Sequence, residues 1–287
     1  MGTGPARLVL VGTPIGNLGD LPPRAAEAFA AADVVACEDT RRTGRLLSHL
    51  GLRAPRLVRL DDHTEEAAAP ELVRLVSEGG VVAVASDAGM PGLSDPGARL
   101  VARAVEAGVT VEVVPGPFAG AVALVASGLL DPSGRFCFEG FLPRKGAARA
   151  ERLADVVGER RTIVLYEAPH RLQRTLADLA DTVGGERRVA LARELTKLHE
   201  EVWRGTLAEA VARCDDVTPR GEYVVVLDGA APPAEVDDDA LRRELVAELD
   251  GGATRRDAAT AVARRHGVAP NRVKRLLTDL DPGSVAD

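Results

Sequence analysis

The first 127 residues alternate short apolar runs with longer segments whose apolar positions recur at helical spacing. Short apolar runs between turn residues are typical of strands buried on both faces, and recurrence every three or four residues is typical of helices. The pattern predicts strands at 7–11, 34–37, 57–60, 81–85 and 109–114, and helices at 22–32, 40–50, 64–77, 99–107 and 118–126. Strands that alternate with helices predict βαβ units and a mostly parallel sheet.

Residues 128–146 interrupt this alternation with turn-forming dipeptides such as Asp131-Pro132 and Ser133-Gly134, and we interpret them as an inter-domain connection. The segment beyond them predicts a second α/β unit, with strands at 161–165, 188–192, 201–205 and 223–227 and helices at 171–182 and 207–214. We therefore expect an N-terminal α/β domain at 1–128 and a C-terminal α/β domain at 129–231.

A Pro-rich and then acidic linker at 230–239 leads to a tail with a purely helical pattern. The pattern predicts helices at 240–249, 255–266 and 270–280, and the short break at Gly267-Val268 is typical of a helix-turn-helix. We expect a small helical domain at 238–287.

Composition excludes several classes of protein. Hydrophobic residues make up 46% of the chain and charged residues 28%, as in globular proteins. The apolar runs are too short for a membrane span or a secretory signal, so we expect a cytoplasmic protein. The three cysteines lie far apart without a Cys-x-x-Cys pair, so we expect neither a disulfide framework nor a metal site.

The charge of the chain is unevenly distributed. The net charge is −7, so any contact with nucleic acid must use a local basic patch. Residues 253–277 hold seven basic side chains and one acid, a net charge of +6, whereas residues 237–250 carry −4. The plain interpretation of the tail is a set of solvated helices, and the sharper one is an electrostatic anchor for RNA.

Candidate chemistry follows the strands of the first predicted sheet, because ligands bind at the carboxyl ends of parallel strands. Residues 12–20 form a glycine-rich loop without the Gly-x-Gly-x-x-Gly or Gly-Lys-Ser/Thr spacing of the common nucleotide-binding motifs. Residues 86–97 hold three glycines, two prolines and two aspartates, which suits a backbone cradle for a cationic or hydroxyl-rich ligand. Residues 115–117 (PGP) suit equally a loop that exposes carbonyl groups with little freedom and a merely stiff turn.

Two polar clusters follow strands of the second unit. They are 166–171 (YEAPHR) and 192–197 (ARELTK). Both are expected at strand ends, which would bring Tyr, Glu, His, Arg and Lys side chains near one cleft.

These segments belong to a longer set that stands in a fixed order along the chain. The set comprises 12–20 (GTPIGNLGD), 38–41 (EDTR), 86–91 (SDAGMP), 95–97 (DPG), 115–117 (PGP), 139–143 (EGFLP), 166–171 and 192–197. From about residue 8 to residue 227 the chain resembles the ribosomal RNA methyltransferases of the tetrapyrrole (corrin/porphyrin) methylase superfamily, which methylate a cytidine ribose 2′-hydroxyl in 16S ribosomal RNA. The tail resembles their helical domain more weakly.

The resemblance implies two α/β domains, S-adenosylmethionine bound in the cleft between them, and a homodimer. It implies cofactor contacts from Pro14, Asp87, Ala88, Gly89, Ser94, Asp95, Pro115, Pro117 and Tyr166. The candidates for a catalytic base or cation are Glu167, His170, Glu194 and Lys197, and their ranking stays open. The candidates for contact with substrate RNA are Arg41, Arg42, His63, Arg144, Lys145 and Arg171, with His170 and Lys197 serving either role.

Two other functions stay open on the sequence alone. One is a tetrapyrrole or precorrin methyltransferase on the same fold, which is not expected to share the EDTR and ARELTK segments or the helical tail. The other is a non-enzymatic nucleic-acid-binding regulator that uses the helix-turn-helix, and the elaborate loops of the α/β domains count against it.

Overall fold

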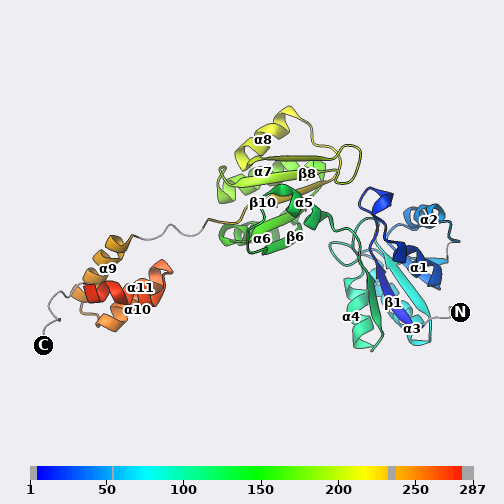
Figure 1. Ribbon diagram of the computed structural model, residues 1–287, viewed down its shortest axis with the longest axis horizontal. Helices are drawn as coiled ribbons and strands as arrows, with labels where there is room; N and C mark the ends of the chain where they lie inside the picture. The colour runs from blue at the N-terminus through cyan, green and yellow to red at the C-terminus, as the bar shows by residue number, and fades with distance from the viewer. Residues whose placement is uncertain (1–4, 54, 232–236, 280–287) are drawn as a thin grey trace. The chain divides into compact units, whose positions relative to one another are not determined.

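The computed structural model describes residues 5–53, 55–231 and 237–279 of the 287-residue chain. The chain divides into two compact units, Met1–Ala230 and Ala231–Asp287. The first unit holds two β-sheets with their helices, and the described part of the second holds three helices (Figure 1). The expected domain boundaries at 128/129, 231 and 238 stay predictions.

The first sheet is parallel, as the alternating pattern predicts. Its strands are β1 (Arg7–Val11), β2 (Val34–Cys37), β3 (Arg56–Arg59), β4 (Val81–Ala85) and β5 (Val111–Val114). Their order across the sheet is β3-β2-β4-β1-β5, and each adjacent pair runs parallel. The carboxyl ends of these strands therefore meet at one edge.

Helices cover both faces of this sheet, which explains why β4 is apolar throughout. Val9 and Val11 pack in the core on one face, and Leu8 and Leu10 pack in the core on the other, because side chains alternate along a strand. The first face is covered by α1 (Pro23–Ala31) and α2 (Thr40–His49), and the second by α3 (Glu65–Ser77) and α4 (Ala98–Glu106).

The second sheet is mixed, a feature that the sequence pattern does not indicate. Its strands are β6 (Phe136–Phe141), β7 (Thr162–Glu167), β8 (Arg188–Arg193), β9 (Glu201–Thr206) and β10 (Tyr223–Leu227), in the order β6-β7-β10-β8-β9. Strand β10 runs antiparallel to both β7 and β8, so that Tyr223 lies opposite Glu167 on one side and Arg193 on the other. The ends of β7 and β8 and the start of β10 therefore share one edge.

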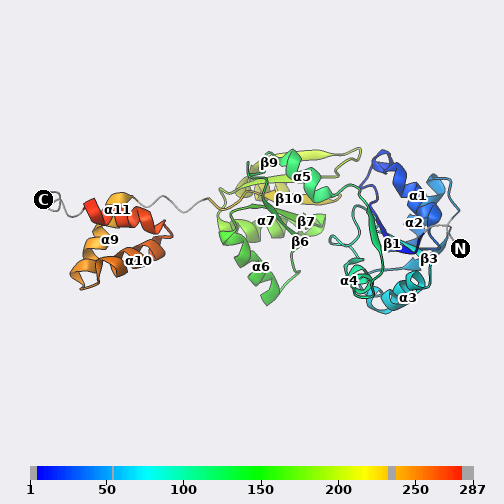
Figure 2. The same ribbon diagram turned by 60° about the horizontal axis from the view of Figure 1, so that its bottom comes forward.

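Three helices cover one face of this sheet and α5 (Ala119–Ser127) covers the other (Figure 2). The three are α6 (Ala147–Gly158), α7 (Pro169–Val183) and α8 (Leu207–Asp216). Helix α5 follows the last strand of the first sheet, yet Ala123 and Leu124 pack against Val164, Ala190 and Val224 of the second. The chain thus crosses between the sheets directly after β5.

The interpretation of residues 128–146 as a connection is wrong, because they contain the edge strand β6. The register with β7 shifts between Phe138 and Gly140, and Gly140 takes a φ of +60°. This β-bulge breaks the alternation that marks a strand. Helix α6, which follows, was not expected because Arg149 occupies its buried face beside Val156.

The described part of the second unit is a three-helix cluster. Its helices are α9 (Asp238–Asp250), α10 (Arg255–His266) and α11 (Pro270–Asp279), with a shared core that includes Leu241, Val262 and Val273. Thr254 caps α10 by accepting from the Asp257 N–H, and Gly267 ends it with a φ of +62°. This confirms the expected helical tail, while linker residues 232–236 and Leu280 lie outside the described residues.

Two further expectations concern cysteines and membranes. Cys37, Cys137 and Cys214 are free thiols; Cys37 and Cys214 are buried, and Cys137 is half-buried. Within the described residues, no helix is both long and apolar enough to cross a membrane.

A buried carboxylate on α3 holds the end of the 86–97 loop. The Gly97 N–H and the Leu100 N–H, at the start of α4, both donate to Glu65 Oε1 at 3.0 Å. Glu65 is 4% exposed, and α4 has no other side-chain cap. Its carboxylate therefore satisfies two buried donors that water does not reach.

We expect Glu65→Ala to lower the free energy of unfolding by about 2–3 kcal/mol, because it leaves two buried N–H groups without an acceptor. Urea unfolding of the full chain measures this loss. The neighbouring Glu66→Ala is the matched control, since Glu66 forms an exposed ion pair with Arg103 that contributes at most about 1 kcal/mol. Equal losses in the two variants would contradict a capping role for Glu65.

Candidate functional site

The loops after β1 and β4 are joined by their backbones. The Thr13 N–H donates to Gly89 O at 2.9 Å, and the Gly89 N–H donates back to Thr13 O at 3.0 Å. The hydroxyl of Thr13 donates to Ser86 O, and the hydroxyl of Ser86 donates to Gly89 O, both at 3.1 Å. Gly89 has a φ of +92°, a conformation that favours glycine. The 86–97 loop is therefore fastened to the 12–20 loop at this point.

A second close approach involves the loop after β5. A Cβ atom on Gly12 would lie 2.5 Å from the Gly116 backbone, and one on Gly116 would lie 2.7 Å from Gly12 Cα. Such distances leave no room for a side chain at either position. Glycine at these two positions thus lets the loops after β1 and β5 touch backbone to backbone.

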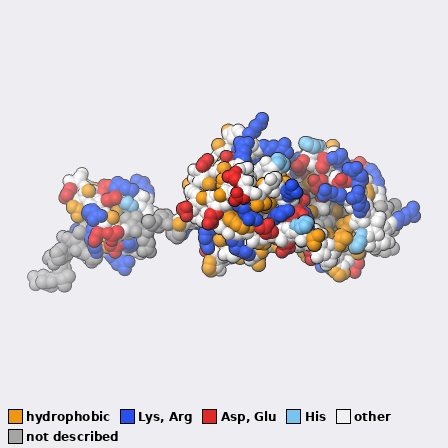
Figure 3. Space-filling model, turned by 90° about the horizontal axis from the view of Figure 1, so that it is seen from above, with side chains coloured by type: hydrophobic (Ala, Val, Ile, Leu, Met, Phe, Trp, Pro, Cys, Tyr) orange, Lys and Arg blue, Asp and Glu red, His pale blue; other side chains and the backbone are white. Residues whose placement is uncertain are grey.

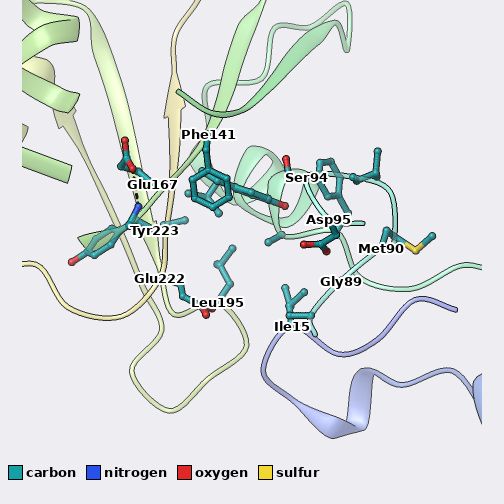
Figure 4. A pocket seen from close by; sticks show the side chains of 18 of the residues that line it. Ile15, Gly89, Met90, Ser94, Asp95, Phe141, Glu167, Leu195, Glu222 and Tyr223 are labelled. Carbon is teal, nitrogen blue, oxygen red and sulfur yellow. Dashed lines mark hydrogen bonds between the residues drawn. The ribbon is translucent and has the colours of Figure 1, made fainter. Parts of the chain in front are cut away.

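These loops form one wall of a cavity of about 300 Å³ that the second sheet closes on the other side. Figure 4 shows Ile15 and Asp95 on the first-sheet side, with Phe141 and Leu195 facing them from the second. The lining is mostly apolar, and on the second-sheet side it comes from the ends of β6, β7 and β8 and from the start of β10. The second-sheet residues are Phe141, Tyr166, Glu167, Ala168, Pro169, Ala192, Leu195, Glu222, Tyr223 and Val224.

Aromatic side chains are scarce in this chain, yet they gather here. Among five Phe, two Tyr and one Trp, the rings of Phe118, Phe138, Phe141 and Tyr166 form a connected group. The centroid of Tyr166 lies 5.0 Å from that of Phe138 and 5.6 Å from that of Phe141. Its hydroxyl accepts from the Gly120 N–H, and burial raises its pKa to about 12. The cavity can therefore receive a flat ring against an apolar wall.

Carboxyl groups supply the polar side of the cavity. Burial, with the nearby carboxylates of Glu38 and Asp87, raises the pKa of Asp95 to about 7. Burial also raises the pKa of Asp87, although Arg42, with Nη1 3.3 Å from Asp87 Oδ2, opposes that shift. A cation placed beside Asp95 would relieve the repulsion among these acids.

An ion-pair network lies where β8 ends and β10 begins. Lys197 Nζ donates to Glu194 Oε1 at 2.9 Å and to Glu222 Oε2 at 2.8 Å. Partial burial disfavours the charged amine, but the two carboxylates outweigh that effect and raise the pKa of Lys197. The hydrogen bond from Lys197 in turn lowers the pKa of Glu194. Lys197 is thus an ammonium at neutral pH, placed beside the cavity-lining Glu222.

The loop after β8, which carries Glu194 and Lys197, also contacts the loop after β1. The Asn17 N–H donates to Thr196 Oγ1 at 3.1 Å, and a Cβ atom on Gly16 would lie 2.4 Å from Lys197 Cγ. Glu194 and Thr196 adopt φ values of +50° and +65°, which are uncommon for residues with side chains. The strained loop therefore presses directly against the glycine-rich loop after β1.

Glu167 lines the cavity through its backbone, while its carboxylate is turned away (Figure 4). That carboxylate has no exposed area and accepts from the Ala168 N–H, the Thr175 hydroxyl and Arg171. With these contacts it holds the start of α7 rather than facing the cavity.

The structure distributes the expected site residues over several places. The cavity lining includes Ala88, Gly89, Ser94, Asp95, Tyr166 and Glu167. Pro14, Arg42 and Asp87 line a neighbouring cavity of about 260 Å³, and Pro115 and Pro117 line an open hollow with Thr196. Arg144, His170 and Arg171 line a further cavity at the start of α7. Arg41, His63 and Lys145 are exposed and line none of these.

Sequence reasoning missed several residues of the cavity, chiefly Glu222, Tyr223 and Val224 at the start of β10. Glu222 precedes β10, and Tyr223 and Val224 begin it, whereas site residues were expected only at positions that follow a strand. The missed aromatic residues Phe118 and Phe141 did carry a signal, because so few aromatic residues occur in the chain.

The described residues hold no group of three or more His, Cys, Asp or Glu side chains arranged for a metal ion. The site is therefore built from backbone, aromatic rings and two kinds of charged group, the carboxyls around Asp95 and the network around Lys197.

The chain is similar in sequence and in structure to known methyltransferases. A relative from Synechocystis sp., "Ribosomal RNA small subunit methyltransferase I", is 48% identical over 78% of this chain and 80% of its own length. A relative of the same name from Escherichia coli O157:H7 is 43% identical over 92% of each chain. The solved uroporphyrin-III-C-methyltransferase of Thermus thermophilus superposes with a TM-score of 0.55, at 26% identity over 77% of this chain and 94% of its own.

The family profile of the Tetrapyrrole (Corrin/Porphyrin) Methylases matches residues 7–211, which include the whole first sheet, strands β6 to β9 of the second and most residues of the cavity lining. This match, with relatives above 40% identity over most of the chain, confirms the expected family and fold. The chain belongs to the tetrapyrrole (corrin/porphyrin) methylase family.

Proposed function

We propose that this protein transfers the methyl group of S-adenosylmethionine to RNA of the small ribosomal subunit, at the ribose 2′-hydroxyl of a cytidine in 16S ribosomal RNA. The observation that carries the RNA substrate is the relative from Escherichia coli O157:H7, which matches 92% of this chain. That coverage extends into the helical tail, whereas the solved tetrapyrrole methyltransferase matches 77%.

The cavity fits S-adenosylmethionine, the methyl donor of this family. The apolar wall around Tyr166 and Phe118 suits an adenine ring, and Gly89, with a φ of +92°, brings backbone without a side chain to the cavity lining. The carboxyl of Asp95 suits the positive charges of the donor. We infer that Ala88, Gly89, Ser94, Asp95 and Tyr166 hold it, with Pro14, Asp87, Pro115 and Pro117 supporting them from adjoining hollows. When bound, S-adenosylmethionine supplies an electrophilic methyl group on a sulfonium.

The chain's own residues then have to orient a hydroxyl and manage its proton. Lys197 is protonated at neutral pH and cannot accept that proton, but its ammonium can stabilise charge that develops on an oxygen. Glu194 already accepts from Lys197 and from the Glu222 N–H, and Glu167 is turned into the protein. Glu222 also accepts from Lys197, through Oε2, but its side chain is 75% exposed and the residue lines the cavity, so we infer that it joins His170 as a candidate base.

Substrate RNA requires local basic patches on a chain of net charge −7. On the face of the molecule drawn in Figure 3, basic and acidic side chains are intermixed. We infer that Arg41, Arg42, His63, Arg144, Lys145 and Arg171 contribute phosphate contacts, with Arg42 restrained by Asp87. A homodimer and a cytoplasmic location belong to the same proposal.

The helical tail adds a second basic patch, although much of its charge is neutralised internally. Arg265 pairs with Glu244 and Glu248, and Arg272 pairs with Asp238, all on the acidic helix α9. Among the described residues, four exposed cations of α10 and α11 have no ion-pair partner: Arg256, Arg264, Lys274 and Arg275. The patch that faces RNA is therefore smaller than the charge of +6 indicates.

Labelled methyl transfer tests the proposed function. We expect the full chain to label RNA in small ribosomal subunits, with the label recovered as 2′-O-methylcytidine after digestion. Label on a base would support RNA as the substrate but contradict the ribose 2′-hydroxyl as the methyl acceptor. Label on a porphyrin precursor and none on RNA would favour a tetrapyrrole methyltransferase, and binding of RNA without any methyl transfer would favour a regulator.

The raised pKa of Asp95 predicts that cofactor binding depends on pH. Below a pH of about 7 this carboxyl is protonated, and a cationic ligand must displace that proton to gain an ion pair. We expect the affinity for S-adenosylmethionine to fall by up to about tenfold for each pH unit below 7, with proton release on binding. Calorimetry in buffers of different ionisation enthalpy measures both effects.

Asp95→Asn should abolish the proton release and flatten the pH profile, while Asp216→Asn, which changes an exposed acid of α8 outside the cavity lining, should leave both unchanged. Equal proton release by wild type and Asp95→Asn would show that Asp95 does not face the cationic donor.

Truncation tests the role of the tail in RNA binding. A chain that ends at Ala234 should bind S-adenosylmethionine as wild type does, because the cavity lies wholly within the first unit. Its affinity for small subunits should fall, and the slope of log affinity against log salt should become shallower by up to about 3–4, given four unpaired cations. Filter binding at several salt concentrations measures the slope; an unchanged slope would make the tail a structural element.

A further inference from the structure

A basic cavity lies at the start of α7, apart from the aromatic cavity. Its volume is about 260 Å³, and its lining comes from the β6–α6 segment, α6 and α7. The lining residues are Arg144, Arg149, His170, Arg171, Arg174 and Thr175. No acidic side chain is among them, which is unusual for a chain with more acids than bases.

Two of these arginines build the floor of the cavity. Arg149 is 4% exposed and donates to Asp178 Oδ2, to Pro143 O and to Thr175 Oγ1 at 2.8–3.0 Å. Arg171 donates to Leu142 O at 2.6 Å and pairs with Glu167 at 3.2 Å. These contacts fix both guanidinium groups, so the floor is held in place before any ligand arrives.

The rim of the cavity carries charge that has weak partners or none among the described residues. Arg144 and His170 are exposed without an ion pair there, and the exposed Arg174 approaches Asp178 at 3.8 Å. Four arginines thus face two carboxylates, Glu167 and Asp178, which leaves a net charge of +2 before His170 is counted. A single anion placed at the rim would be attracted by this excess.

The basic cavity continues from the aromatic one along the chain. Phe141 lines the aromatic cavity, Leu142 accepts from Arg171, and Arg144 lines the basic cavity. On α7, Pro169 lines the first cavity and the next residue, His170, lines the second. Adjacent Cα atoms are about 3.8 Å apart, so the two cavities adjoin each other where neighbouring residues line one and then the other.

We propose that the basic cavity binds a backbone phosphate of the substrate RNA, next to the nucleotide that receives the methyl group. The proposal rests on the proposed function and assigns a substrate subsite to it. Guanidinium groups pair with phosphate oxygens in a fixed, forked geometry. Phe141, which is 52% exposed at the boundary of the two cavities, offers a ring face on which an unpaired base can stack. A phosphate contact and a stacked base together would position a ribose at the aromatic cavity.

The test uses the full chain with rim arginines removed, Arg144→Ala/Arg174→Ala, which leaves Arg149 and Arg171 in the floor. We expect affinity for small-subunit RNA to fall about tenfold and the salt slope to become shallower by about 1, as for the loss of one phosphate contact. The affinity for S-adenosylmethionine and the urea midpoint should stay at wild-type values.

Arg160→Ala is the matched control. Arg160 is also an exposed arginine near the second sheet, and it has no ion pair among the described residues. It lies before the start of β7, however, whereas the basic cavity lies beyond the end of that strand. Six strand residues separate the two ends by roughly 20 Å. RNA affinity and salt slope should be unchanged in this variant.

RNA carrying one neutral methylphosphonate linkage makes the test position-specific. At one linkage, neutralisation should weaken binding by wild type about tenfold and have no further effect on Arg144→Ala/Arg174→Ala, since both changes remove the same contact. Additive effects at every linkage, or an affinity equal to that of Arg160→Ala, would overturn the subsite. Weakened binding of S-adenosylmethionine by the double variant would instead assign the cavity to the donor. Failure of wild type to bind or methylate the RNA would overturn the proposed function itself.

Discussion

The paired backbone hydrogen bonds between Thr13 and Gly89 are the constraint on which the site depends. They join the loops after β1 and β4, and the contact between Gly12 and Gly116 adds the loop after β5. Three loops from separate strands thereby become one wall. Because that wall is fixed by backbone contacts, the second sheet can close the cavity from the other side, where it supplies about half of the lining residues.

The first half of the site follows from sequence because all its strands run in one direction. In a parallel sheet, every residue that follows a strand lies at the same edge, so the loops at 12–20 and 86–97 could be brought together without knowing the strand order. Their glycines and prolines also marked them as shaped backbone. The sequence could not assign different roles to Asp87 and Asp95. Only the structure shows that Arg42 pairs with Asp87, while Asp95 lines the cavity.

The second half could be predicted only in part, because β10 runs against its neighbours. An antiparallel strand brings its first residues, not its last, to the edge where the ligand binds, and Glu222 was missed for that reason. The bulge at Gly140 concealed β6, and the buried Arg149 concealed α6, because each breaks the periodicity on which prediction relies. The net charge counted over residues 253–277 likewise overstated the basic patch of the tail, because acids of α9 pair with Arg265 and Arg272.

The position of α5 has a consequence for how the chain folds as it is made. Helix α5 is rich in Ala and Val and ends at Ser127, but the sheet that covers it is complete only when β10 ends at Leu227. Synthesis proceeds at about 5–20 residues per second, so this apolar helix is made roughly 5–20 s before the last of its partner strands. During that interval the nascent chain presents an unpaired apolar surface, which makes α5 the segment where chaperone binding or aggregation would begin.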